Sequence, residues 1–261
     1  MPTYVIEHME DDNPDTSFPH WIALEYAQMI KWAGEGNTVV FSSLSPTSVK
    51  SLSEQLVARG AREGSFRAET KSVRELMSDE GVPIEKVCLL DPRAENEIAP
   101  GDGNEYDWFL FGGILGDDPP RDRTGILRRD GYPGRHLGPV QMTTDTALGV
   151  TSLIVSPPHK TLSTITFIDH PTIRFDEHEG VEMPFRYIVD ERTGEPVLPE
   201  GMREHLNHSA PSSFVYIFSL GNHGRPSRIL RCHAPTAVRW RSHRMLSFSV
   251  RAVVDAFKQS R

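Results

Sequence analysis

The stretch from Trp108 to Ala147 constrains the fold more than any other part of this 261-residue chain. It opens with an apolar run, Trp108 to Phe111, and glycines follow at positions 112, 113 and 116. An apolar run that ends in glycines is typical of a buried strand whose exit loop turns sharply or lets a ligand approach the backbone. The rest of the stretch predicts a short helix, a second strand that ends at Leu137 and Gly138, a turn and a longer helix.

That longer helix begins with polar side chains suited to capping. Thr143, Thr144 and Asp145 offer side-chain oxygens at its start, and the helical pattern continues to about Ile154. A third strand exit follows at Ile168 to Pro171. Because ligands of α/β proteins bind at the carboxyl ends of strands, we predict a binding site where these loops meet.

Strand and helix patterns alternate along the chain. We expect strands at residues 4–7, 38–42, 86–90, 108–111 and 163–169, and helices at 19–32, 45–58, 72–77 and 143–154. A last short helix is expected from residue 199. This alternation predicts an α/β fold in which a mostly parallel sheet is covered by helices on both faces.

Several common sites lack their sequence signatures. The glycines follow the fourth expected strand and do not form GxGxxG, and neither a P-loop GK[ST] nor a GxSxG elbow is present. His170, Asp176, His178 and Glu179 lie close in sequence, but no secure helix places them as metal ligands, so we predict no metal site. Ordinary tight turns remain an alternative reading of the glycines.

The charge is distributed unevenly. Residues 1–210 carry 19 Lys/Arg against 35 Asp/Glu, a net charge of −16, whereas residues 211–261 carry nine against one, a net charge of +8. An acidic body repels nucleic acid and attracts a basic partner, although acidity also simply favours solubility. No run approaches the roughly 18 apolar residues of a membrane span, and the start lacks a secretory pattern. Cys88 and Cys232 are expected to be reduced thiols of a cytoplasmic protein.

Six segments, in this order, resemble a fungal family of protein arginine methyltransferases in the SPOUT (α/β-knot) superfamily. They are IEHME, VCLLDPRA, FLFGGILGDDPPRDRT, LGPVQMTTDTA, FIDHP and EMPFRYIVD. The resemblance covers about Tyr4 to Met202 and implies a deep trefoil knot in the C-terminal part of the sheet. We therefore expect a SPOUT-like methyltransferase domain at 1–207. The basic C-terminal extension at 208–261 does not resemble the family's acidic end, and we expect it to be either disordered or divergent.

The same resemblance implies S-adenosylmethionine as the cofactor, bound by three loops. The first comprises Phe111, Gly112, Gly113, Ile114, Leu115 and Gly116; the second Leu137, Gly138, Val140, Gln141, Met142 and Thr143; the third Ile168, Asp169 and Pro171. It further implies a monomer that monomethylates an arginine of a basic small-subunit ribosomal protein. An RNA methyltransferase and a knotted module that binds cofactor or ribosomal protein without turnover are the alternatives.

Methylation of a guanidinium requires a carboxylate nearby. The group has a pKa above 12 and is a poor nucleophile until a carboxylate orients it and accepts a proton. Our candidates are Asp122, on a proline-stiffened charged loop beside the glycines, and Glu182, before the Met-Pro-Phe segment. The weaker alternatives are Asp117, Asp145, Asp169 and Glu179, for which helix capping, ion pairing or plain solvation competes as an explanation.

Overall fold

A parallel sheet forms the centre of the molecule. The computed structural model describes residues 2–8, 17–113, 124–176 and 179–209, and the backbone of 216–220 and 226–230. Within these residues the main sheet has six strands in the order β3–β2–β1–β5–β4–β6, with parallel pairing throughout. The strands are β1 (Thr3–Glu7), β2 (Thr38–Ser42), β3 (Phe66–Ala68), β4 (Val87–Leu90), β5 (Trp108–Gly112) and β6 (Gly134–Arg135). The predicted mostly parallel sheet is confirmed.

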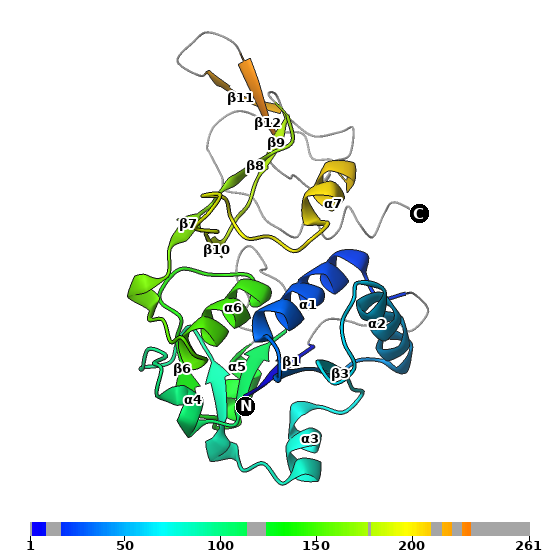
Figure 1. Cartoon of the computed structure of the whole chain (residues 1–261), viewed down its shortest axis with the longest axis vertical. Helices are drawn as coiled ribbons and strands as arrows, with labels where there is room; N and C mark the ends of the chain where they lie inside the picture. Colours follow the sequence, from blue (N-terminus) through cyan, green and yellow to red (C-terminus); the bar gives the residue numbers. More distant parts are fainter. Residues whose placement is uncertain are drawn as a thin grey trace, which may run out of the picture.

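Helices cover both faces of this sheet, as predicted. One face is covered by α1 (His20–Ala33), α2 (Pro46–Ala58) and α6 (Thr144–Val155), and Figure 1 shows α1 and α6 side by side. The other face is covered by α3 (Val73–Glu80) and α5 (Thr124–Arg129). Alternate residues of β1 divide between the faces: Tyr4 and Ile6 pack toward α1, and Val5 packs toward α3.

Local sequence chemistry explains where these helices begin. The Ser45 hydroxyl accepts the Ser48 N–H at 3.1 Å ahead of α2, and Pro46 occupies the first helical turn, where no N–H is required. Ser72 and Glu75 form a reciprocal capping box at the start of α3. The short α4 (Asp102–Glu105) precedes β5.

Two predicted strands differ from the structure in their length or in the strand with which they pair. The strand expected at 163–169 is a 3-10 turn, η2 (Leu162–Thr164), followed by β7 (Phe167–Asp169). The turn forms because Thr161 and Thr164 cap each other, which leaves three residues to pair. They pair antiparallel with β10 (Arg186–Ile188) outside the main sheet. The strand expected to end at Leu137 is the two-residue β6. Strand β3 was not predicted, because an edge strand of three residues gives little hydrophobic periodicity.

The chain beyond α6 forms a separate region at one end of the sheet (Figure 1). It contains β7, β10 and α7 (Met202–Ser209), together with β8 (Thr172–Arg174), β9 (Gly180–Glu182), β11 (Tyr216–Leu220) and β12 (Pro226–Leu230). No helix among the described residues is long and apolar enough to cross a membrane. The trefoil knot and the division at residue 207 stay predictions.

Candidate active site

The first loop leaves β5 at the middle of the sheet. Gly112 lies in register with Glu7 of the neighbouring β1, and the Gly113 N–H donates to the Glu7 carbonyl at 2.8 Å. Gly113 has a φ of +23°, which a side chain would strain. Phe111 is 3 % exposed and packs in the core, so the loop presents its backbone there. The predicted contacts Ile114, Leu115 and Gly116 lie outside the described residues.

The second loop runs from Leu137 to Thr143. Gly138 has a φ of +87°, and its N–H donates to the His136 imidazole Nδ1 at 3.1 Å. A Cβ built on Gly138 would meet no atom within 4 Å, so the loop borders open space at this point. The apolar side chains on this loop remain half-exposed, and they are Leu137, Val140 and Met142.

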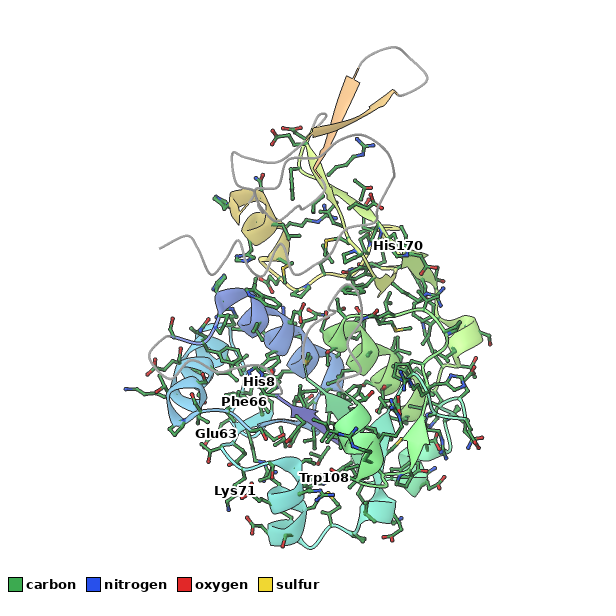
Figure 2. The ribbon with its side chains drawn as sticks, turned by 180° about the vertical axis from the view of Figure 1, so that it is seen from behind. His8, Glu63, Phe66, Lys71, Trp108 and His170 are labelled. Atoms are coloured by element: carbon green, nitrogen blue, oxygen red, sulfur yellow. The ribbon has the colours of Figure 1, made fainter. Side chains whose placement is uncertain are left out.

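The third loop lies at the end of β7. The Asp169 carboxylate accepts two hydrogen bonds from the Arg186 guanidinium, at 2.6 and 2.9 Å, and this partner holds the pKa of Asp169 below its usual value. The same guanidinium lies 5.0 Å from the centre of the Phe167 ring. Figure 2 shows His8 within the body at the end of β1 and His170 on the segment above it.

Hydrogen bonds join the three loops to one another. The Thr144 hydroxyl, at the start of α6, donates to the Gly113 carbonyl at 3.3 Å and so connects the first loop to the second. The Arg186 N–H donates to the Gln141 carbonyl at 2.9 Å, and Met142 forms a parallel bridge with Arg186. The structure therefore brings together the loops that the sequence predicted to meet.

Polar side chains anchor the strand ends around the first loop. The Glu7 carboxylate is 7 % exposed and accepts from the hydroxyls of Ser42 at 2.5 Å and Ser43 at 2.7 Å and from the Val73 N–H at 2.9 Å. Asp91, at the end of β4, binds the Arg128 guanidinium through Nε and, at 2.6 Å, through Nη2. Since Arg128 belongs to α5, the contact with Asp91 joins this helix to the end of β4.

A buried acidic cluster lies directly behind the second and third loops. Glu25 of α1, Asp145 of α6 and Tyr187 of β10 are 8 %, 2 % and 2 % exposed. Burial, followed by the neighbouring Asp145, raises the pKa of Glu25 well above its usual value. Burial raises the pKa of Asp145 to about 6, opposed by hydrogen bonds from Thr143 and from backbone N–H groups. Burial and both carboxyls raise the pKa of the Tyr187 hydroxyl.

The predicted carboxylates are distributed around this region. Asp122 and Asp117 lie outside the described residues. Glu182 is exposed at the end of β9, opposite Thr172 and close in the chain to the third loop. Glu179 belongs to a tight turn with Asp176. Glu25 and Tyr187 were not predicted from the sequence. An isolated acid in an apolar helix and a tyrosine in a strand belong to no recognisable motif.

A surface pocket of about 590 Å³ lies elsewhere, at the amino ends of the strands. It is bordered by Pro2, by Trp32 to Asn37 and by the segment from Ser152 to Lys160. These residues lie ahead of β1, at the end of α1 and ahead of β2, or at the end of α6 and just after it, so the pocket is at the edge opposite the three loops. Among the described residues, no group of three or more His, Cys, Asp or Glu side chains is arranged to hold a metal ion.

Comparisons with known proteins agree with this arrangement. The chain is 41 % identical over 215 residues to protein arginine N-methyltransferase SFM1 of Saccharomyces cerevisiae, across 80 % of this chain and 96 % of that protein. The crystal structure of yeast SFM1 complexed with SAM matches with a TM-score of 0.67 at 39 % identity, over 80 % of this chain and 91 % of that one. The complex of yeast SFM1 with SAH matches with a TM-score of 0.66 at 40 % identity, over 78 % and 94 %.

The similarity includes all three loops and confirms the SPOUT fold class that the resemblance implied. The model of the family described as protein arginine N-methyltransferase SFM1-like matches residues 3–213, which is most of the chain. This protein therefore belongs to the SFM1-like family of protein arginine N-methyltransferases.

Proposed function

We propose that this protein monomethylates an arginine of a basic small-subunit ribosomal protein. Its family membership establishes the coarser activity, that of an S-adenosylmethionine-dependent protein arginine methyltransferase. The ribosomal acceptor and the transfer of a single methyl group are our additions. The observation that carries the proposal is the convergence of the three loops at one edge of the sheet.

The loop residues suit a nucleoside with an amino-acid tail. Leu137, Val140 and Met142 offer half-exposed apolar surface to an adenine ring, and the backbone of the glycine loops offers hydrogen bonds. The open space beside Gly138 is room that a larger residue would fill. We assign cofactor binding to these loops and to Ile168, Asp169 and Pro171. The cofactor, when bound, supplies an electrophilic methyl group.

The remaining chemistry belongs to the protein. Methyl transfer is a displacement whose rate depends mainly on how the nucleophile is held. An acidic side chain must orient the guanidinium and accept the proton that its nitrogen loses. Asp122 and Glu182 remain our predicted candidates for that proton, and the exposure of Glu182 beside the third loop is compatible with contact to a protein substrate.

Charge supports a basic protein as the acceptor. The net charge of −16 on residues 1–210 favours encounter with a cationic protein and disfavours RNA. A ribosomal protein meets that requirement, because such proteins are basic in order to bind RNA. We expect the enzyme to act on this acceptor as a monomer in the cytoplasm.

The proposal is tested with radiolabelled S-adenosylmethionine, salt-washed small-subunit proteins and total RNA. We expect label in one basic ribosomal protein as monomethylarginine, and its loss in Gly138→Val. Gly60→Val is the matched control, since Gly60 also has a positive φ and open space around it but lies away from the loops. Label in RNA alone would contradict the proposal.

A further inference from the structure

The cluster of Glu25, Asp145 and Tyr187 differs from the other buried acids of this protein. Glu7 accepts two hydroxyls and an N–H, Asp91 binds Arg128, and Asp102 binds Arg135 at 2.9 Å. Glu25 and Asp145 instead lie on α1 and α6, which pack against each other, and the Asp145 carboxyl contributes to raising the pKa of Glu25. No cationic group is among the charges that act on these two carboxyls in the described part of the chain.

The third member of the cluster is a buried tyrosine. Within the described residues, the buried hydroxyl of Tyr187 has no hydrogen-bond partner, although Asp145 and Glu25 both act on it electrostatically. An unsatisfied buried hydroxyl and two adjacent buried carboxyls are each unfavourable in the native state. Groups arranged so unfavourably are concentrated at functional sites, where a ligand completes them.

Two members of the cluster are connected to the three loops. Asp145 follows the second loop by two residues, and its neighbour Thr144 hydrogen-bonds the first loop at Gly113. Tyr187 is paired with Ile168 of the third loop. Thr143 and Thr144, which precede Asp145 directly, are half-buried, whereas Asp145 is buried.

We propose that Glu25, Asp145 and Tyr187 form the receptor for the acceptor guanidinium. A planar cation with five N–H donors pairs with a carboxylate in bidentate fashion, and it supplies the positive charge that the two acids lack. The Tyr187 hydroxyl oxygen accepts a further N–H. The inference rests on the proposed function only in that the acceptor is an arginine; it does not depend on which protein carries that arginine.

The first test measures binding in the presence of S-adenosylhomocysteine, with N-acetyl-arginine amide as the probe and N-acetyl-lysine amide as its control. The arginine probe should raise the thermal midpoint of the wild type, and the lysine probe should do so much less, because it lacks the planar pair of donors. Glu25→Gln, Asp145→Asn and Tyr187→Phe should lose this response. Glu54→Gln, an exposed change on α2, should retain it.

The second test asks whether the three residues bind the acceptor guanidinium or only stabilise the loops predicted to bind the cofactor. The three variants should raise the acceptor KM by about tenfold or lower kcat, while the dissociation constant of S-adenosylhomocysteine stays within about twofold of the wild type. Glu25→Gln should also unfold at the same or a higher temperature without ligand, because it removes the repulsion. Retained arginine response, or a parallel loss of cofactor affinity in all three variants, would overturn the inference. Tyr187→Phe removes only the hydroxyl oxygen and keeps the ring in place. It can therefore be measured even if Glu25→Gln or Asp145→Asn does not fold.

Discussion

The two faces of the main sheet hold their buried acids in different ways. On the face covered by α3 and α5, Glu7 and Asp91 are surrounded by donors that include two hydroxyls, backbone N–H groups and the Arg128 guanidinium. On the face covered by α1 and α6, Asp145 accepts hydrogen bonds from Thr143 and from backbone N–H groups, and no cation is among the charges that act on Asp145 or Glu25 in the described residues. The first arrangement stabilises the loop ends, and the second retains an unfavourable interaction beside the site. Acids paired with cations or several donors thus build the scaffold, and the two acids that lack a cation lie next to the predicted binding loops.

The largest effect is expected from Asp91→Ala. This change leaves the half-buried Arg128 without its carboxylate and should lower the free energy of unfolding by about 3 kcal/mol, measured by urea denaturation. Glu35→Ala is the control, because the Glu35–Arg62 pair is almost fully exposed and should contribute nothing measurable. If Asp91→Ala and Glu35→Ala lowered the free energy of unfolding equally, the structural role of Asp91 would be contradicted.

The pH dependence of stability should separate the two faces. The pKa of Asp145 is raised to about 6 in the folded state, so its folded form holds a proton that the unfolded chain has released. Stability from this group is therefore present at low pH and is lost as pH rises from about 4 to 6. Glu25 adds a change of the same sign, since burial and the neighbouring Asp145 raise its pKa as well. The double variant Glu25→Gln/Asp145→Asn should flatten this part of the wild-type profile; an unchanged profile would show that the acids do not interact.

A smaller effect is expected when a glycine of the second loop is compared with a glycine in a turn elsewhere in the protein. Gly138→Val places a β-branched residue at a φ of +87° and should cost about 1–2 kcal/mol of stability, and Gly60→Val should cost a similar amount at +84°. Cofactor affinity, measured by calorimetry, should fall only in Gly138→Val. A fall of the same size in both variants would mean that general destabilisation explains the loss.

The smallest effect is expected at the third loop. Arg186→Lys loses the two-bond contact with Asp169 and the contact with the Phe167 ring, and it should weaken cofactor binding a few-fold, equivalent to about 0.5–1 kcal/mol. Arg192→Lys is matched to it, because Arg192 pairs with Asp190 in the same region but is 88 % exposed. Calorimetry that finds no difference between the two would contradict a role for Arg186 in holding this loop.

The sequence predicted the elements with strong local signals. The β-branched Thr38–Ser42 strand has the predicted bounds, and the helix expected from Thr143 begins at Thr144, because apolar periodicity and capping residues are local properties. β7 was assigned to the wrong sheet, because pairing partners are set by tertiary packing. Glycines that follow a strand are also a local signal, and from them we predicted a binding site at these loops. Glu25 lies 120 positions before Asp145, so only the fold brings the two acids together.

The most direct test of this account is a crystal structure of the enzyme with S-adenosylhomocysteine and an arginine peptide from its acceptor. The account predicts the cofactor against Gly113 and Gly138, and the guanidinium within hydrogen-bond distance of Asp145, with Glu25 and the Tyr187 hydroxyl around it. A guanidinium held elsewhere, with the acidic cluster still closed behind the loops, would contradict it.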